Sequence, residues 1–369
     1  MKNEQMESAS MILTSRERLL YGLRHLYSRF GYRPFRMSKF EKYELYARNR
    51  DFLVSDRVIT FYEAGGELMA LKPDVTLSIV RSASYRPGRK EKFSYQETVY
   101  RPAGNARQFR EIMQCGLECI GDLDSYDEYE VMRLAERSLL MTEMPCVLSF
   151  SHLGIMNCLM DALHADESER LTLRKLLAAR SEHELSGMFS SKAWPEALLK
   201  DLKTLLSIAA GPSELPARLA DFGWLAEDVR DELKALSILY HGQDTAAVFD
   251  FSVSGDLHYY NGLVFQGFVR GISEKVLSGG RYDRLLERME RPGSAVGFAV
   301  YFSLLEQLGN DAEEYDADVL LLYDSATPLT VLRDRVQALT DEGRSVLAQR
   351  TPGGRVRITE DLRGGAVDA

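Results

Sequence analysis

The sequence predicts an α+β fold in which two strand-rich regions are separated by a long helical stretch. Strand-forming runs bounded by turn residues occupy residues 50–121 and return over 248–300. Between them, residues 167–240 are rich in Leu, Ala, Glu, Lys and Arg, which favour helices. We therefore expect one sheet domain with a helical subdomain inserted at 167–240.

The first element is predicted to be a helix that begins at Thr14 or Ser15 and ends at Gly31. Glu17 lies three residues after Thr14, which is the spacing of a capping box. The apolar residues that follow recur with the period of a helix. They are Leu19, Leu20, Leu23, Leu26, Tyr27 and Phe30.

Short strands and turns are expected after this helix. Residues 52–54 and 58–62 predict strands, and Gly65-Gly66 lies between two apolar runs, as in a hairpin. The remaining elements of this half are a helix over 75–84, a strand, loop and strand over 92–121, and a helix over 125–141.

The second half contains the insertion and further strands. Within the insertion, helices fit residues 172–179, 194–209 and 228–239. Strands are predicted over 248–253, 258–268, 275–277 and 294–300. Gly279-Gly280 is interpreted as the opening of a helix over 282–289, and another helix is expected from residue 301.

Length and charge narrow the classes of function. The chain has 369 residues, of which 45% are hydrophobic, and a net charge of -9. This balance excludes a disordered chain and disfavours a strongly basic nucleic-acid binder. No apolar run reaches the roughly 18 residues that span a bilayer, and the first ten residues lack the apolar segment of a signal peptide. We expect a soluble, cytoplasmic protein without a membrane partner.

The cysteines do not indicate a metal site. Cys115 and Cys119 are four residues apart, and no His follows them closely. We interpret these two, with Cys146 and Cys158, as buried reduced thiols, while a zinc site or a disulfide is the alternative. No metal and no cofactor is predicted.

Four polar clusters interrupt the apolar segments and are the candidates for a functional site. They are Lys72-Pro73-Asp74-Val75-Thr76, Gln114 with Glu118, His258-Tyr259-Tyr260-Asn261, and Ser278-Gly279-Gly280-Arg281. The two-residue period of a strand places Gln114 and Glu118 on one face. A buried carboxylate there requires partners.

Each cluster also has a structural interpretation. Asp74 and Thr76 could cap the helix that follows them. The Gly279-Gly280-Arg281 run could be a tight turn whose arginine forms a structural ion pair. The sequence contains no Ser-His-Asp candidate, zinc-protease motif or phosphate-binding loop. Carboxylates, amides and phenols together suit an amino-acid pocket, with Asp74 for the ammonium and Glu118 with a tyrosine hydroxyl for a second group.

In their order along the chain, these segments resemble the catalytic core of histidyl-tRNA synthetase, a class II aminoacyl-tRNA synthetase. The similar segments are ALKPDVTLSIVR at 70–81, YQETVYRPAGNARQFREIMQCGLECIGD at 95–122, HYYNGLVFQGF at 258–268, SGGRYDRLLE at 278–287 and SAVGFAVYFSLLEQL at 294–308. The resemblance spans roughly residues 12–308. It implies a mixed, mainly antiparallel sheet flanked by helices, with a core domain over 1–310.

The same resemblance implies which residues bind histidine. Asp74 and Thr76 would meet the α-amino group, and Gln114 would contact the backbone part of the ligand. Glu118 and Tyr260 would reach the imidazole, with Tyr259 nearby. Of the arginines of the second class II motif, Arg101 and Arg110 are retained.

Other positions depart from the synthetase pattern. Leu304 stands where the third motif has an arginine near the ATP adenine, and Tyr301 replaces a small glycine there. Gly255 replaces an arginine that assists the chemistry at the α-phosphate, and His258 replaces an acidic residue. Ser38 replaces a proline at the dimer interface. Because phosphoryl transfer needs charge stabilisation, we expect that aminoacylation is lost.

A site that keeps histidine contacts and loses ATP contacts is similar to the regulatory subunits of ATP phosphoribosyltransferase, which catalyses the first step of histidine biosynthesis. The resemblance implies a non-catalytic subunit that activates a short catalytic subunit and mediates feedback by L-histidine. It also implies a homodimer within a hetero-oligomer, a hetero-octamer in the family. Histidine could bind in the synthetase-like pocket or between subunits.

The end of the chain is interpreted as the remnant of a domain. Strand, helix and strand over 319–323, 327–342 and 345–348 resemble the opening of the anticodon-binding domain of the synthetases. We therefore expect a truncated domain over 311–369, with a mobile tail from 351.

Two other functions remain open on the sequence alone. One is a divergent but active histidyl-tRNA synthetase, in which Arg270 or Arg281 would replace the missing arginines. The other is a tRNA-binding or stress-sensing module with a synthetase-like domain.

Overall fold

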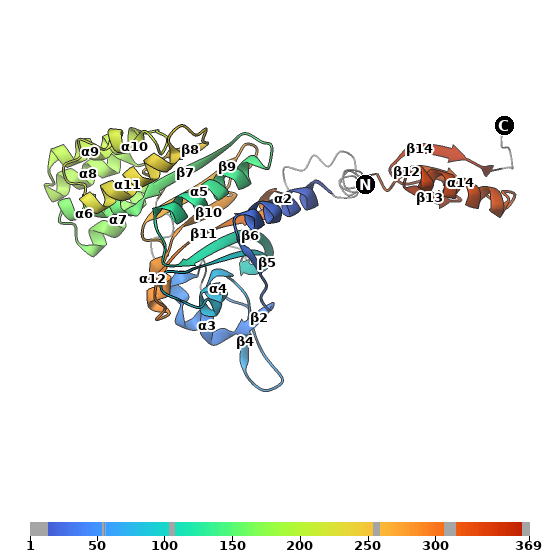
Figure 1. Cartoon of the computed structure of the whole chain (residues 1–369), viewed down its shortest axis with the longest axis horizontal. Helices are drawn as coiled ribbons and strands as arrows, with labels where there is room; N and C mark the ends of the chain where they lie inside the picture. The colour runs from blue at the N-terminus through green and yellow to red at the C-terminus, as the bar shows by residue number, and fades with distance from the viewer. Residues whose placement is uncertain are drawn as a thin grey trace. The chain divides into compact units, whose positions relative to one another are not determined.

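The computed structural model describes residues 14–53, 55, 57–102, 108–253, 259–305 and 315–363. The chain divides into two compact units, Met1–Leu308 and Gly309–Ala369. The first contains a large sheet with an attached group of helices, and the second contains a small sheet with one helix (Figure 1).

An eight-stranded mixed sheet forms the centre of the first unit (Figure 1). The strand order is β1-β5-β6-β11-β10-β9-β7-β8, and only the pairs β1–β5 and β7–β8 are parallel. The strands are β1 (Arg33–Phe35), β5 (Lys90–Pro102), β6 (Phe109–Gly121), β7 (Cys146–His152), β8 (Ala247–Phe249), β9 (Leu263–Val269), β10 (Leu277–Arg281) and β11 (Ser294–Tyr301). The mixed, mainly antiparallel sheet flanked by helices is thereby confirmed.

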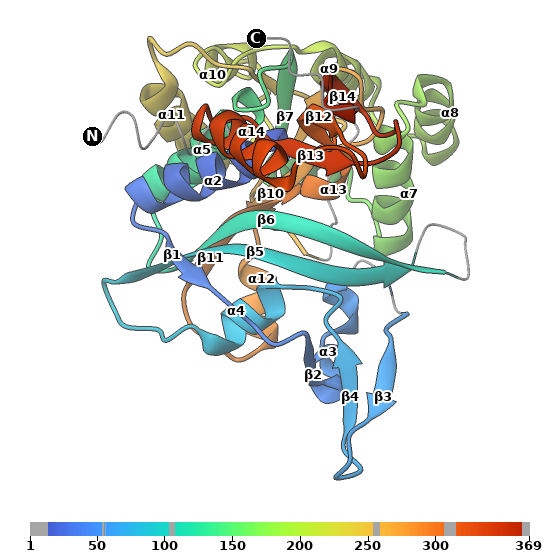
Figure 2. The ribbon, with the colours of Figure 1, turned by 90° about the vertical axis from the view of Figure 1, so that its right-hand side faces the viewer.

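Helices cover both faces of this sheet, as Figure 2 shows. One face is covered by α2 (Ser15–Arg29) and α5 (Ser125–Leu140), and the other by α4 (Thr76–Ser82) and α12 (Asp283–Arg288). The capping box predicted for the first helix is present, because Thr14 and Glu17 exchange hydrogen bonds between side chain and backbone.

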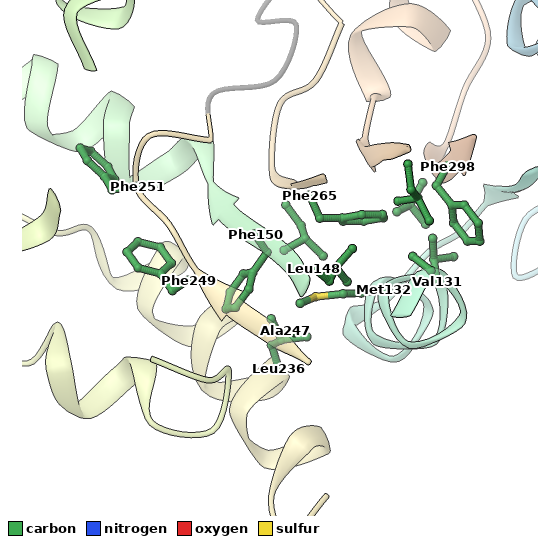
Figure 3. Packing of buried hydrophobic residues seen from close by; sticks show 14 of the residues in the cluster. Val131, Met132, Leu148, Phe150, Leu236, Ala247, Phe249, Phe251, Phe265 and Phe298 are labelled. Carbon is green, nitrogen blue, oxygen red and sulfur yellow. The ribbon is translucent and has the colours of Figure 1, made fainter. Parts of the chain in front are cut away.

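The core on the α5 face continues into the inserted helices (Figure 3). Met132 of α5 lies close to Leu148 of β7, and the Phe150 ring meets Phe249 edge to face with centroids 5.8 Å apart. Each such fully buried side chain contributes roughly 1.5–3 kcal/mol. Leu236 of the insertion belongs to the same core, so these helices are attached by apolar packing.

The insertion is helical throughout its regular elements. Its helices are α7 (Glu167–Ala178), α8 (Glu182–Lys192), α9 (Glu196–Ser207), α10 (Leu215–Arg218) and α11 (Glu227–Tyr240), and α6 (Leu153–Ala162) precedes them. The three helices predicted there correspond to α7, α9 and α11.

A second, three-stranded antiparallel sheet in the first unit contains the predicted hairpin. Its order is β2-β4-β3, with β2 (Phe40–Lys42), β3 (Thr60–Tyr62) and β4 (Leu68–Leu71), and α3 (Tyr43–Arg48) follows β2. The strand predicted over 52–54 is wrong at Phe52, where the 3-10 helix η1 (Arg50–Phe52) ends, and Val54 lies outside the described residues. Three apolar residues are too few to establish a strand period.

Two predicted boundaries near the end of the first unit are also wrong. Gly279 and Gly280 lie inside β10, between β9 and β11, and do not open a helix. A side chain at Gly279 would come within 2.5 Å of Phe265 and Phe298, so a glycine permits this packing. The strand predicted from 258 begins only at Leu263, and α13 (Phe302–Leu305) follows β11 directly.

The second unit is a three-stranded parallel sheet, β13-β12-β14. Its elements are β12 (Ala317–Leu322), α14 (Leu329–Asp341), β13 (Val346–Gln349) and β14 (Val356–Asp361). Leu339 of α14 packs on Val319 and Leu321. The tail expected from 351 is therefore corrected, since residues 356–361 form β14 and pair along β12. Three of the six residues of β14 are charged, so the segment lacks the apolar pattern of a buried strand.

Two further observations concern membrane-spanning helices and the cysteines. In the part of the chain that the structure describes, no helix is long and apolar enough to cross a membrane. All four cysteines are free thiols, and Cys115 and Cys119 are buried.

Candidate functional site

A cavity of about 200 Å³ opens on the sheet face covered by α4 and α12. It brings together all six residues predicted to bind histidine, from three separate stretches of the chain. They are Asp74, Thr76, Gln114, Glu118, Tyr259 and Tyr260.

Strand β6 presents Gln114 and Glu118 to this cavity. Cys115 and Leu117 point to the opposite face and join the core under α2 and α5. The two-residue period predicted from the sequence therefore separates a polar face from an apolar one within one strand. Gln114 and Glu118 are only 3% and 2% exposed.

Two hydroxyl groups hold the Glu118 carboxyl group. The Thr76 hydroxyl donates to Oε1 at 2.8 Å, and the Tyr282 hydroxyl donates to Oε2 at 2.6 Å. Burial raises the pKa of Glu118 from 4.5 to about 8, although both hydrogen bonds oppose the shift. Glu118 is therefore mainly protonated at neutral pH.

Asp74 lies two residues before the first residue of α4 and both caps the helix and lines the cavity. Its Oδ1 accepts a hydrogen bond from the Leu77 amide at 2.9 Å, which stabilises the first turn of the helix. The same side chain lines the cavity. Burial raises the pKa of Asp74, and the Arg101 guanidinium opposes this shift.

The two arginines retained from the second motif have different positions. Arg101 lines the cavity, its Nε donates to the Pro73 carbonyl at 2.8 Å, and its guanidinium lies 3.7 Å from Asp74 Oδ2. Arg110 pairs with Arg101 across β5 and β6 but is exposed and lies outside the cavity lining. The structure thus brings only Arg101 into the site.

Aromatic rings form one wall of the cavity. The rings of Tyr259 and Tyr260 are 4.9 Å apart, and Tyr259 lies 5.2 Å from Tyr282 and 6.1 Å from Phe52. Tyr259 and Tyr260 lie in the segment before β9, outside the strand in which the sequence analysis placed them.

Of the predicted departures, Tyr301 reaches the cavity and Leu304 does not. Tyr301 lines the cavity, where its hydroxyl interacts with Arg101 and Ser278. Burial raises the pKa of Tyr301, while both neighbours oppose the rise. Leu304 packs against the core of the sheet. Gly255 and His258 lie outside the described residues.

Sequence reasoning missed two tyrosines of the site. Tyr282 follows the Gly279-Gly280-Arg281 cluster and holds Glu118, and Tyr95 of β5 lines the cavity beside it. Alternation along an extended strand could have identified Tyr282, since it is two residues from Gly280. Nothing in the sequence singled out Tyr95.

This arrangement can bind a small polar ligand that carries both charges and a ring. Asp74 offers a carboxylate, Arg101 a guanidinium and Glu118 a neutral carboxyl group, while the tyrosines offer ring faces and hydroxyl groups. Within the described ranges, no group of three potential metal ligands occurs.

Comparison with known proteins gives a family match over most of the chain. The model of the family described as histidyl-tRNA synthetase matches residues 10–305. A histidine–tRNA ligase of Methanocaldococcus jannaschii is 26% identical over 310 residues, which cover 81% of this chain and 73% of the relative. An ATP phosphoribosyltransferase regulatory subunit of Oceanobacillus iheyensis is 27% identical over 304 residues, covering 80% and 75%.

Solved structures share the fold. An ATP phosphoribosyltransferase regulatory subunit/histidyl-tRNA synthetase from Bacillus halodurans superposes with a TM-score of 0.75 at 22% identity, covering 95% of this chain and 94% of the other. An ATP phosphoribosyl transferase (HisG:HisZ) complex from Thermotoga maritima contains a chain with a TM-score of 0.61 at 19% identity, covering 77% and 96%.

Proposed function

The chain belongs to the histidyl-tRNA synthetase family, and we propose that it is a non-catalytic regulatory subunit of ATP phosphoribosyltransferase in histidine biosynthesis. In this role it binds a short catalytic subunit, activates it, and transmits feedback inhibition by L-histidine. Relatives named as regulatory subunits of this enzyme support the role. The solved complex of two kinds of subunit supports a catalytic partner.

One observation carries this proposal: the six residues that the resemblance assigns to histidine line one cavity, and Tyr301 lines the same cavity. The resemblance assigns Tyr301 and Leu304 to positions where synthetases have a glycine and an arginine near ATP. Tyr301 adds a phenol ring beside Arg101, and Leu304 is packed into the core. Both changes remove groups or space that adenylate formation needs.

The proposed pose of histidine follows from the charges of the cavity. The α-ammonium group lies against Asp74, and the carboxylate lies toward Arg101. The imidazole lies between Glu118 and the rings of Tyr259 and Tyr260. Because Glu118 is protonated before binding, it can donate a proton to the imidazole or lose it to solvent when an imidazolium binds.

Histidine feedback requires that the ligand prefer one arrangement of the complex. A ligand with equal affinity for two states shifts neither population. We propose that histidine-bound cavities favour the inhibited arrangement of a hetero-oligomer built on homodimers of this chain. The family resemblance is the support for this assembly.

A reconstitution experiment tests the proposal. The purified chain is mixed with a short-form catalytic subunit, and formation of phosphoribosyl-ATP is measured with and without histidine. We expect activation, and inhibition by histidine that is weakened in Glu118→Ala without loss of activation. Absence of activation refutes the regulatory role. Unchanged histidine inhibition in Glu118→Ala refutes this cavity as the effector site and leaves the subunit interface.

Active histidyl-tRNA synthetase is the second candidate, because Arg101 lines the cavity and several relatives are named histidine–tRNA ligase. This function predicts histidine-dependent exchange between ATP and pyrophosphate. The first proposal predicts none. A tRNA-binding role is tested separately by filter binding over a range of salt, since binding to phosphates weakens steeply as salt rises.

A further inference from the structure

The segments that bring Tyr260 and Tyr282 to the cavity are joined by a polar cluster outside it. Asn261 follows Tyr260 directly, while Arg281 and Asp283 stand on either side of Tyr282. Tyr260 and Tyr282 line the cavity, whereas the cluster of Asn261, Arg281 and Asp283 lies outside the lining.

Asn261 and Asp283 form a reciprocal pair. The Asn261 Nδ2 donates to Asp283 Oδ2 at 3.1 Å, and the Asp283 backbone amide donates to Asn261 Oδ1 at 2.7 Å. The backbone amide of Asn261 also donates to the backbone carbonyl of Arg281 at 2.9 Å. Three hydrogen bonds therefore connect the segment before β9 to the segment after β10.

Arg281 and strand β11 also donate hydrogen bonds to the Asp283 carboxylate. Arg281 Nε donates to Oδ2 at 2.7 Å, and the Ala295 amide of β11 donates to Oδ1 at 2.9 Å. Arg281 also bonds to Glu128 of α5 at 2.8 Å and to the Ser294 hydroxyl at 3.2 Å. The structural ion pair considered for Arg281 from the sequence is thus present.

The tyrosine rings have little freedom once this cluster is formed. Tyr260 packs over the backbone of Gly280, where a side chain would lie 2.8 Å from its ring. Its ring also lies against Tyr259, which in turn touches Tyr282. A shift of Asn261 would therefore move Tyr260, its neighbour in the chain, within the cavity wall.

We propose that Asn261 and Asp283 are positioning residues for the ligand cavity, which hold Tyr260 and Tyr282 at the distance that the bound ring requires. The inference rests on the proposed function for the identity of the ligand, histidine. The positioning itself is a property of the unliganded protein and can be measured without a ligand.

The variant Asn261→Asp tests this with a pH-dependent signal. It replaces the Nδ2 donor by a carboxylate oxygen against Asp283 Oδ2, and two carboxylates at that distance are compatible only when they share a proton. Arg281 faces the pair and partly offsets the repulsion. Glu128 shares Arg281, and Glu232 of α11, which is hydrogen-bonded to His152, lies near Glu128, so these two carboxyl groups also act on the pair.

Histidine affinity is measured by calorimetry on the full chain, with the native protein at the same pH as reference. At about pH 8 we expect Asn261→Asp to bind roughly tenfold more weakly than native, and at about pH 6 roughly threefold or less, as a shared proton restores the pair. Asn261→Ala cannot share a proton and is expected to be weakened equally at both pH values.

A matched control places the same substitution beside a cation. Asn157 of α6 accepts a hydrogen bond from Arg174 at 3.4 Å, so Asn157→Asp adds the same charge next to a guanidinium. We expect native affinity and no difference in pH dependence for this variant.

A second measurement reads the position of Tyr260 directly. Protein labelled with 3-fluorotyrosine is observed by ¹⁹F NMR, and the Tyr260 resonance is assigned by its loss in Tyr260→Phe. In unliganded Asn261→Asp the resonance is expected to shift at high pH and return at low pH. If resonance and affinity match the native protein at both pH values, the positioning role is overturned. If native protein does not bind histidine but the resonance behaves as described, positioning stands and the proposed ligand fails.

Discussion

Gly297 of β11 lies directly opposite Glu118 of β6, and the missing side chain leaves the space that the Glu118 carboxyl group occupies. A Cβ atom at Gly297 would overlap Oε2 of that group. Tyr95 uses the same device, since a Cβ at Gly116 would lie 2.6 Å from its hydroxyl oxygen. Two glycines on neighbouring strands thus leave space for the side chains of Glu118 and Tyr95, which line the cavity.

The substitution Gly297→Ala should therefore damage the site. Glu118 must leave its hydrogen bonds with Thr76 and Tyr282, and overpacking costs roughly 1–3 kcal/mol of unfolding free energy. We expect histidine binding, measured by calorimetry, to fall by at least about tenfold. Gly65→Ala is the control, because nothing lies within 4 Å of the added methyl group. If Gly297→Ala bound histidine with the affinity of the native protein, Glu118 would not depend on the space left by Gly297.

The raised pKa of Glu118 has a consequence for stability. With a pKa of about 8 when folded and 4.5 as the ordinary value, the folded chain holds a proton that the unfolded chain releases between these pH values. The contribution of Glu118 to unfolding free energy therefore falls as pH rises, by about 1.4 kcal/mol per pH unit in this window. Glu118→Gln cannot release a proton and should lack this slope.

Urea unfolding followed by tryptophan fluorescence measures the slope. Trp194 and Trp224 both lie in the first unit, so their signal reports on the part that contains Glu118. The unfolding free energy of the native protein, relative to that of Glu118→Gln, should fall between about pH 5.5 and about pH 7.5. A constant difference would mean that Glu118 ionises with an ordinary pKa.

The buried ion pair between Lys72 and Glu97 predicts that replacing one partner lowers the unfolding free energy more than replacing both. Their side chains are 2% and 14% exposed, and Glu97 also accepts a hydrogen bond from the Met37 amide at 3.3 Å. Lys72→Met leaves a buried carboxylate without its cation, which costs about 3–5 kcal/mol. The double variant Lys72→Met/Glu97→Leu should recover part of this loss.

An exposed ion pair provides the comparison for this experiment. The side chains of Arg48 and Glu44 are 75% and 64% exposed. Arg48→Met should therefore change unfolding free energy by less than about 0.5 kcal/mol. Equal effects of Lys72→Met and Arg48→Met in urea unfolding would show that the buried pair is already solvated.

Removing the second unit should leave ligand binding intact. Every residue that lines the cavity lies within Met1–Leu308. A chain that ends after Leu308 is expected to bind histidine within about threefold of the full chain, which is less than about 0.7 kcal/mol. Loss of binding, with the native circular dichroism of the first unit retained, would assign residues after Leu308 a role in the site.

Long elements could be predicted because their determinants are local. The helix from Ser15 carries its own capping box, and the two 13-residue strands β5 and β6 alternate strongly enough to separate polar from apolar faces. Short segments could not be predicted in this way. Phe52 ends a 3-10 helix, and half of the residues of β14 are charged, so neither segment has a clear period.

For the site, the sequence by itself determined the chemical groups: Asp74, Gln114, Glu118 and the tyrosine pair are polar residues in apolar segments that must meet partners. Only the tertiary structure decided which groups meet. It brought Tyr282 to Glu118, left Arg110 outside, and placed Gly297 where the carboxyl group needs space. The protonation of Glu118 also belongs to the tertiary structure, because desolvation and hydrogen bonding depend on neighbours that are distant in the chain.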